Sequence, residues 1–286
     1  MLTALITGLA IGALYAAAAL AYNVMYSTSK VLSVTTGHIF MVSGVVGAYL
    51  IGGLKLPTVV GFFGAAAAGV VFGLITEFVA IRRVLARSDE HLWLLSTLAL
   101  ATIIQQGVGL WWGTEPKPFP RLIPQDFTAG IWDQKFWLPI ATVAVLMVGL
   151  ELFYRRTLFG KIFIAVSEDA FAARARGVAT DRVRAISYAI AGLLGGIAGF
   201  AAGQLTYAYF ALGLSLTLNG FIALAVGGLG SNLGAVVGGI VLGLLTSIAT
   251  FYFGGAYQQT IAVGLLMTFL LVKPEGLFGD KRTRHV

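Results

Sequence analysis

The 286-residue sequence has no cysteine and few charged residues. The absence of cysteine excludes disulfide bonds, thiolate metal sites and cysteine nucleophiles. Asp, Glu, Lys and Arg together make up 11% of the chain, whereas soluble domains contain about 25%. A chain with so few charged side chains cannot cover a surface that faces water on every side.

Long apolar runs take the place of the missing charge. Hydrophobic residues make up 58% of the chain, and residues 185–272 contain no Asp, Glu, Lys or Arg. Runs of about 18 or more apolar residues are typical of membrane-spanning helices, whereas a transmembrane β-barrel would show segments of about ten residues with alternating polarity. The sequence therefore predicts an all-α protein, a polytopic transmembrane helical bundle in which residues 1–286 form a single domain.

Motifs for catalysis and nucleotide binding are also missing. The three histidines, His38, His91 and His285, lie far apart and lack the spacing of metal ligands. Neither a G-x-S-x-G nucleophile motif nor a G-x-x-x-x-G-K-[ST] nucleotide-binding loop occurs. We therefore expect no enzymatic activity, metal or cofactor in this chain. The net charge of +7 does not indicate a nucleic-acid partner, because the basic residues lie in short loops, where they set membrane orientation.

The apolar runs predict eight or nine membrane spans. The run Ser215–Leu229 is short, and we expect it to be re-entrant or broken. The second run leaves two alternatives open: if it crosses the membrane the N-terminus lies outside, and if it is re-entrant the N-terminus lies inside. The predicted runs are about 2–26, 31–53 and 57–80, then Leu92–Trp112, Phe136–Phe153, Ala185–Phe210, Ser215–Leu229, Leu233–Phe253 and Ala256–Val272.

Three groups of basic residues predict the cytoplasmic side, since cytoplasmic loops carry the excess of Lys and Arg. The groups are Arg82, Arg83 and Arg87; the block 155–184; and the tail residues Lys273, Lys281, Arg282 and Arg284. The loop between Trp112 and Phe136, with Glu115, Lys117, Arg121, Asp126 and Asp133, has no basic excess and is expected outside. The C-terminus is therefore expected in the cytoplasm.

The block 155–184, RRTLFGKIFIAVSEDAFAARARGVATDRVR, contains a segment rich in helix-forming residues. We expect a short amphipathic helix that ends at Gly177, since glycine is frequent at helix C-termini. Its alanine and glycine residues would give a flat surface on which another protein can dock. The alternative is a solvated basic loop that only sets orientation. The candidate docking residues are Glu168, Asp169, Phe171, Ala172, Ala173, Arg174, Arg176 and Gly177.

Polar residues interrupt two apolar runs, in SVTTGHIFMVSG at 33–44 and LTLNGFIAL at 216–224. Aligning Gly37 with Gly220 pairs Thr36 with Asn219, which suggests broken helices in two structural repeats, where transporters place their passage. The alternative is that these side chains bond across helices as ordinary interior groups. The candidate pathway residues are Thr35, Thr36, Gly37, His38, Gln105, Asn219 and Gly220.

Glycine is abundant and often recurs at small-xxx-small spacing, as in Gly195-Gly196…Gly199…Gly203 and Gly234…Gly238-Gly239…Gly243. In lipid such faces allow helix backbones to approach closely. We expect tight packing within the bundle, with contact between two subunits as the alternative.

Several stretches, in order along almost the whole chain, resemble one family. They are GLAIGALYAAAALAYNVMY, EFVAIR, TLFGKIFIAVSEDAFAARARGVATDRV, NGFIALAVGGLGSNLGAVVGGIVLGLL and LLVKPEGLFG. Together they resemble the inner-membrane permeases of branched-chain amino acid ABC importers. The block 155–184 is similar to the coupling-helix loop of ABC importer permeases, which docks on the ATPase. The Glu that opens the usual loop motif is replaced by Phe171 here.

The resemblance implies a transport subunit of the bacterial inner membrane. Its implied partners are a second, related but different permease, two cytoplasmic ATPase subunits that bind Mg-ATP, a periplasmic substrate-binding protein and membrane lipid. The cargo would be a branched-chain or related hydrophobic amino acid, or a similar small polar solute. An importer of urea, amides or another small organic solute, an ATP-independent channel or facilitator, and a membrane scaffold remain alternatives.

The sequence departs from the family at one candidate pathway segment. The usual stretch resembles N-F-A-[HQ]-G-E, whereas this chain has Ser33-Val34-Thr35-Thr36-Gly37-His38. The Asn, the His or Gln, and the acid are all replaced. If the segment lines the pathway, we expect a specificity that differs from that of a typical branched-chain amino acid permease.

Overall fold

A computed structural model describes residues 1–85, 92–120, 133–273 and 276–279 of the chain. Within these ranges the protein is helical, and the extended contacts amount to one isolated bridge between Lys117 and Ala208. The predicted all-α class is confirmed. Some residues named in the sequence analysis lie outside the described residues. They are the charged residues Arg87, Arg121, Asp126, Lys281, Arg282 and Arg284, and the histidines His91 and His285.

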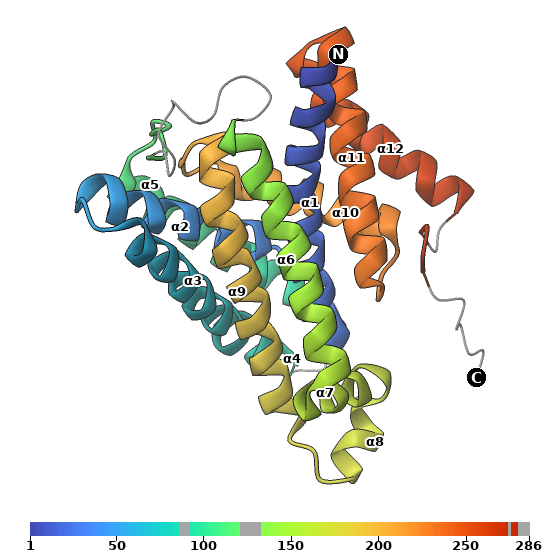
Figure 1. The fold of residues 1–286 in the computed structure, drawn as a ribbon. Coiled ribbons are helices and arrows are strands. Elements are labelled where there is room, and N and C mark those ends of the chain that lie inside the picture. The colour runs from blue at the N-terminus through green and yellow to red at the C-terminus, as the bar shows by residue number, and fades with distance from the viewer. Residues whose placement is uncertain (86–91, 121–132, 274–275, 280–286) are drawn as a thin grey trace.

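Figure 1 shows the order of the described helices along the chain. A π-helical turn, Tyr49–Gly53, extends α2, and another, Thr76–Ile81, joins α3 to α4. A 3-10 turn, Gly255–Tyr257, precedes α12. The helices are α1 (Leu2–Ser29), α2 (Thr36–Ala48), α3 (Thr58–Ile75), α4 (Arg82–Leu85), α5 (Leu92–Trp112), α6 (Gln134–Arg156), α7 (Leu158–Glu168), α8 (Ala170–Ala175), α9 (Thr180–Thr206), α10 (Leu212–Gly227), α11 (Asn232–Phe253) and α12 (Gln258–Val272).

Eight helical segments within the described residues are long and apolar enough to cross a membrane. The second apolar run forms the 18-residue segment Thr36–Gly53, which is long enough to cross. The run expected to be short is α10, an apolar helix of 16 residues. The predicted total of eight or nine spans therefore agrees with the fold, while the expectation of two structural repeats stays a prediction.

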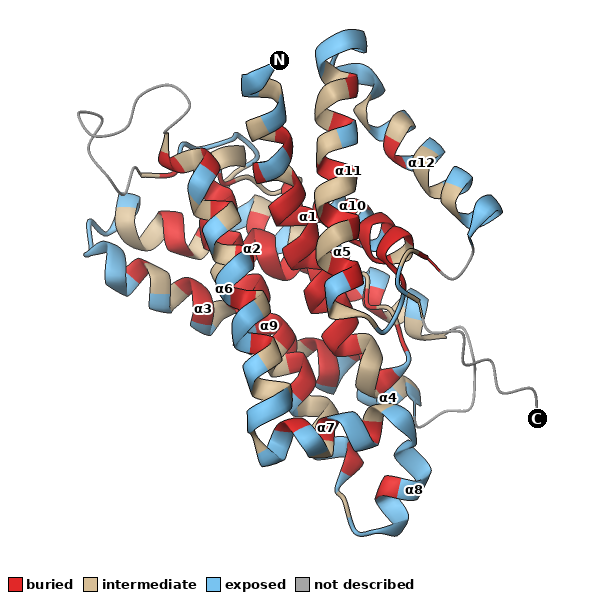
Figure 2. Cartoon of the chain, turned by 45° about the vertical axis from the view of Figure 1, so that its right-hand side comes forward, coloured by how far each residue is buried: buried red, intermediate tan, exposed pale blue. Residues whose placement is uncertain are grey.

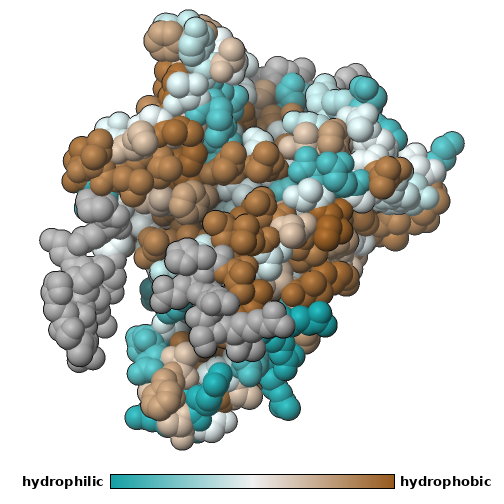
Figure 3. Space-filling view, turned by 180° about the vertical axis from the view of Figure 1, so that it is seen from behind, coloured by the Kyte–Doolittle hydropathy of each residue, from teal (hydrophilic) through white to brown (hydrophobic). Residues whose placement is uncertain are grey.

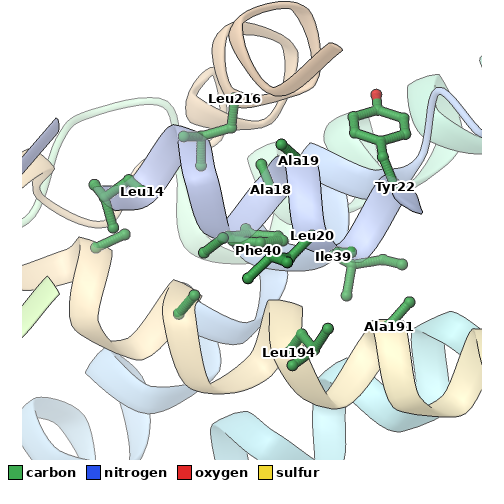
Figure 4. Close-up of a cluster of buried hydrophobic side chains, with 14 of the residues drawn as sticks. Leu14, Ala18, Ala19, Leu20, Tyr22, Ile39, Phe40, Ala191, Leu194 and Leu216 are labelled. Atoms are coloured by element: carbon green, nitrogen blue, oxygen red, sulfur yellow. The ribbon is translucent and has the colours of Figure 1, made fainter. Parts of the chain in front are cut away.

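Helix α1 lies at the centre of the bundle, and its residues from Ala13 to Met25 are buried (Figure 2). Large side chains from α1, α2, α9 and α10, among them Leu20, Phe40 and Leu194, fill the space around it (Figure 4). Helix α12, by contrast, leans away from the bundle and is mostly exposed (Figures 1 and 2). The core therefore consists of helices drawn from both halves of the sequence.

Glycine residues set how closely these helices approach. A methyl group at Gly239 or Gly243 of α11 would meet the backbone of α1 at Ala16 and Gly12, and one at Gly199 of α9 would meet Phe40 of α2. Small residues in membrane helices permit such backbone contact. The glycine-rich stretches therefore serve packing within the bundle, as expected.

Helices α7 and α8 project from the end of the bundle opposite to Met1 (Figure 1). Seen from behind, hydrophobic side chains form a band across the middle of the molecule, and hydrophilic side chains gather toward the end that carries these helices (Figure 3). Such a band is what a lipid-facing surface requires, because side chains that meet lipid tails must be apolar.

Candidate functional site

The loop after α6 is a folded unit anchored to the bundle. The Thr157 hydroxyl caps α7 by accepting from the Gly160 amide at 2.9 Å. Gly160 packs directly on the backbone of α6, where a side chain would collide with Phe153. Phe163 adds ring contacts to Phe153 and Tyr154, with centroids 6.4 and 5.4 Å apart. Helix α7 is therefore held against α6 and does not move as a free loop.

A second anchor joins the loop to the end of α1. The Lys30 ammonium group donates to the Ser167 carbonyl at 2.7 Å. Lys30 directly follows α1, and its partial burial lowers the pKa of its ammonium group from the ordinary value, because burial disfavours the charged form.

The expected short helix is in fact a pair of helices. Asp169 separates α7 from α8, and its carboxylate accepts from the amides of Phe171 and Ala172, both at 2.9 Å. This N-cap satisfies two amides that lack helical partners. The single helix expected over this stretch is therefore interrupted at Asp169, because an aspartate N-cap favours a new helix start.

The expected glycine at the helix end is confirmed. Gly177 has φ +86°, a left-handed conformation that favours glycine. Its amide donates to the Arg174 carbonyl at 3.0 Å, and the Val178 amide donates to the Ala173 carbonyl at 3.1 Å. These two bonds form a Schellman motif, the common way in which a helix ends at glycine.

Most candidate docking residues face solvent. Phe171 is 84% exposed, whereas Ala173 is 6% exposed and packs inward. The other exposed members of the set are Glu168, Asp169, Ala172, Arg174, Arg176 and Gly177. Helix α8 thus presents a large apolar side chain outward while one alanine contacts the rest of the loop.

Charged residues link α8 to the buried part of the bundle. The Arg174 guanidinium donates to the Thr180 hydroxyl at 3.1 and 2.7 Å. Asp181 lies between Arg174, at 3.8 Å, and Arg184, at 3.1 Å. Arg184 in turn contacts Glu77 at 3.1 Å. The pair of Glu77 with Arg184 was not predicted from the sequence, although an acid within an apolar run is a signal for a functional residue.

The polar segment 33–38, which ends in the first turn of α2, lies in the interior. The side chains of Ser33, Thr35, Thr36 and His38 are at most 2% exposed. The Ser33 and Thr35 hydroxyls lie 2.6 Å apart, and Thr35 contacts the Thr76 hydroxyl of the π-helical turn at 3.2 Å. These residues therefore join the start of α2 to the end of α3.

The two polar stretches identified in the sequence lie against each other. The Gly37 amide donates to the Thr217 hydroxyl of α10 at 3.1 Å, and that hydroxyl donates to the Val34 carbonyl at 3.1 Å. A side chain at Gly37 would meet the backbone of α10 at Gly213. Thr217 was not among the candidate residues, since one threonine in an apolar helix gives no local sign of its partner.

Gln105 of α5 contacts the polar segment through His38. His38 Nε2 is 3.2 Å from the Gln105 Oε1 atom, and His38 Nδ1 is 3.3 Å from the Val34 carbonyl. Asn219, by contrast, donates to the Ser215 carbonyl of its own helix at 2.9 Å, and Gly220 packs against Ala18 of α1. The structure thus brings Thr35, Thr36, Gly37, His38 and Gln105 together and gives Asn219 and Gly220 other partners.

Cavities open at both ends of the bundle. One of about 520 Å³ is lined by residues that include Thr7, Gln134 and Gln204. At the other end, a cavity of about 350 Å³ is lined by residues that include Asn23 and Glu151. Helices α1 and α6 contribute to both cavities, whereas the segment 33–38 lines neither. A pathway along that segment stays a prediction.

A bundle of membrane-spanning helices, with a polar interior segment and a short helical loop projecting from one end, has the architecture of a membrane transport subunit. The chain belongs to the family of permease components of branched-chain amino acid transport systems, which matches residues 4–272. It is therefore a permease component and not a catalytic subunit.

Curated relatives match the chain over different lengths. The chain is 27% identical to the high-affinity branched-chain amino acid transport system permease protein LivH of Escherichia coli K12, over 98% of this chain and 96% of that protein. It is 27% identical to BraD of Pseudomonas aeruginosa, over 99% and 97%. The autoinducer 2 import system permease protein LsrC of Klebsiella pneumoniae is 30% identical, over 52% of this chain and 44% of that protein.

A solved structure shares the fold. PsaBC from Streptococcus pneumoniae in complex with Fab contains a chain that matches with a TM-score of 0.55 and 12% identity. The match covers 96% of this chain and 91% of that one. At this identity, the likeness concerns the fold alone.

Proposed function

We propose that this chain is the transmembrane permease subunit of an ATP-driven importer in the bacterial inner membrane. The observation that carries the proposal is helix α8, which projects from a membrane-spanning bundle of the permease family with Phe171 84% exposed. A short helix held at both ends and open on its outer side suits a docking contact with a motor protein.

Orientation follows from the charges at this end. Arg82, Arg83 and the block 155–184 place basic side chains at the end that carries α7 and α8, which supports a cytoplasmic position. Met1 lies at the opposite end of the bundle (Figure 1), so in this orientation the N-terminus lies on the periplasmic side and α12 runs toward the cytoplasm.

The partners are two cytoplasmic ATPase subunits, which bind Mg-ATP, a second permease of related but different sequence, and a periplasmic binding protein. Each permease offers its α8 to one ATPase. Since Phe171 stands where the family motif has Glu, this contact is apolar here rather than ionic. Apolar burial of an aromatic side chain is a strong source of interface energy.

The cargo is an amino acid, branched-chain or related hydrophobic, or a similar small solute. LivH and BraD are permeases of branched-chain amino acid transport systems, which supports an amino acid as the cargo. The replaced residues in Ser33–His38 support a specificity that differs from theirs, and LsrC illustrates a partial relative with another named cargo. A urea, amide or other small organic solute is the second candidate, favoured by those same replacements.

The pathway proposal concerns the contact between α2 and α10. Thr35, Thr36, Gly37 and His38 are buried, and His38 contacts the half-buried Gln105. Asn219 and Gly220 lie on α10, whose Thr217 contacts Gly37. Separation of α2 from α10 would expose hydroxyl, imidazole and amide groups to a polar solute in transit. In membrane proteins such interior polar groups often mark a substrate path.

The first test is affinity purification from native membranes in mild detergent, followed by mass spectrometry. Recovery of two ATPase subunits and a second permease is the expected result. Recovery of the chain alone, in several detergents, would contradict the proposal and favour a facilitator. Specificity is tested separately: high-affinity leucine transport by the complex with its cognate binding protein would contradict the divergent cargo.

A further inference from the structure

Glu77 is a buried acid with one unused oxygen. Its side chain is 1% exposed, and that of Arg184 is 12% exposed. The Nε and Nη2 atoms of Arg184 both contact Glu77 Oε1 at 3.1 Å. Among the described residues, no hydrogen-bond donor reaches Glu77 Oε2, which is buried. A buried polar atom without a partner calls for an explanation, since such atoms are rare in folded proteins.

Stability alone does not account for this pair. Removing two charges from water carries a large penalty, and well-packed apolar residues often stabilise a protein as much as a buried ion pair does. The pair is also incompletely satisfied, because an arginine edge usually contacts one carboxylate oxygen with each nitrogen. A small rotation of the Glu77 carboxylate would give Oε2 its own donor, so two arrangements of the same pair are available.

On one side, the pair is linked to α8. Arg184 Nη1 contacts Asp181 at 3.1 Å, and Asp181 also contacts Arg174 of α8 at 3.8 Å. Arg174 additionally holds the Thr180 hydroxyl at the start of α9. Movement of α8 therefore acts on the Asp181 carboxylate, which shares the Arg184 guanidinium with Glu77.

On the other side, the pair is linked to α2 and α10. Glu77 lies in the π-helical turn Thr76–Ile81, and π-helical turns are frequent at functional sites. Its neighbour Thr76 contacts Thr35 at 3.2 Å. The adjoining residues of that segment, Val34 and Gly37, bond to Thr217 of α10. A shift of the π-helical turn therefore reaches the contact between α2 and α10.

We propose that Glu77 and Arg184 are positioning residues that transmit the movement of α8 to the contact between α2 and α10. The inference rests on the proposed function, in which an ATPase moves α8. When α8 moves, the contact between Asp181 and Arg184 changes. The Glu77 carboxylate then rotates from one of its two arrangements to the other. The π-helical turn then carries the shift through Thr76 to Thr35.

The test is hydrogen exchange of the peptide 31–40 in the complex with its ATPase subunits, with and without ATP. In the wild-type complex, ATP changes this exchange at least fivefold. Glu77→Gln and Arg184→Gln each lower the thermal melting temperature, because each leaves one buried charge without its buried counter-charge. In the double variant Glu77→Gln/Arg184→Gln the melting temperature recovers and ATP is still hydrolysed, but the ATP-induced change in exchange is lost.

The matched control is the pair Glu151 and Arg155, which lies at the same end of the bundle and is mostly exposed. Its double variant Glu151→Gln/Arg155→Gln keeps both the melting temperature and the ATP-induced change. If the Glu77→Gln/Arg184→Gln variant also keeps that change, the pair has only a structural role and the inference is overturned.

Failure of the proposed function gives a different result. In that case no ATPase subunit co-purifies with the wild-type chain. If the ATPase subunits co-purify but ATP leaves the exchange of peptide 31–40 unchanged, the inference fails and the proposed function stands. Where no ATPase subunit co-purifies, the link is tested in the purified chain alone. There, Glu77→Gln alters exchange of peptide 31–40 and Glu151→Gln does not; equal exchange in both variants overturns the link.

Discussion

At the scale of single residues, the structure separates side chains that hold the fold from those that are exposed. Phe171 is large, apolar and exposed, whereas Gly37 is fixed by the backbone of a neighbouring helix. Substitutions at these two positions should therefore have different effects. A substitution at Phe171 should lower transport without affecting folding, whereas one at Gly37 should destabilise the fold.

Replacing Phe171 with alanine should lower ATP-dependent uptake at least tenfold, because the ATPase contact loses its aromatic side chain. The melting temperature should stay unchanged, since the ring is 84% exposed. Leu158→Ala is the control, as Leu158 is 77% exposed on α7 of the same loop. Uptake and melting curves on both variants check the prediction, and equal uptake in both would contradict it.

Gly37→Ala should destabilise the protein by about 1–3 kcal/mol, the usual range for forcing extra atoms into a packed core. The added methyl group would meet the backbone of Gly213 and Thr217, which cannot move aside as a side chain can. Gly149→Ala on α6 is the control, because nothing lies within 4 Å of the methyl group there. Denaturation in detergent measures both, and a stable Gly37→Ala variant would refute the packing argument.

At the scale of elements, α8 is short and depends on its two ends. A helix of six residues forms few helical hydrogen bonds. The Asp169 N-cap and the left-handed Gly177 therefore fix where α8 begins and ends. A substitution at Gly177 is therefore a poor probe of docking, because any other residue strains the backbone at φ +86°. Ala172 is exposed and helical, which makes it the better site for added bulk.

Ala172→Trp should block assembly with the ATPase while leaving the permease folded. The large side chain covers the docking surface of α8, and tryptophan is tolerated in an exposed helix. Co-purification of ATPase subunits measures assembly, and the melting temperature measures folding. Normal recovery of ATPase with this variant would show that α8 is not the docking surface.

Asp169→Ala should loosen α8 by about 1 kcal/mol, the typical contribution of an N-cap. Exchange at the amides of Phe171 and Ala172 should rise severalfold, since both amides lose the carboxylate acceptor. Asp133→Ala, which removes the cap of the much longer α6, serves as the control and should leave α8 unchanged. Unaltered exchange in α8 would contradict the role given to Asp169.

At the scale of the whole molecule, hydropathy predicted the spans well and the contacts between them poorly. The run Leu92–Trp112 matches α5 residue for residue. Helix α9, however, starts at Thr180, whereas the predicted apolar run starts at Ala185. The difference arises because the first turn of α9 contains charged residues, including Asp181 and Arg184, and precedes the apolar stretch. Hydropathy locates the apolar part of a helix, and the helix itself can begin before that part.

Long-range contacts left little local signal. The polar segment before α2 was identified because hydroxyl groups and a histidine interrupt an apolar run. Its contact between Gly37 and Thr217 joins residues 180 positions apart. The pair of Glu77 with Arg184 joins residues 107 positions apart. No local pattern encodes such pairings, so the sequence indicated candidate residues but not the contacts that they make.

The proposed function requires that this permease moves its cargo with energy from ATP. The most direct measurement is uptake by proteoliposomes that contain the complete complex, with the cognate binding protein outside and ATP or ADP inside. We expect the cargo of the complex to accumulate against a gradient with ATP and not with ADP. Equal, merely equilibrating uptake under both conditions would contradict it and identify the protein as a facilitator.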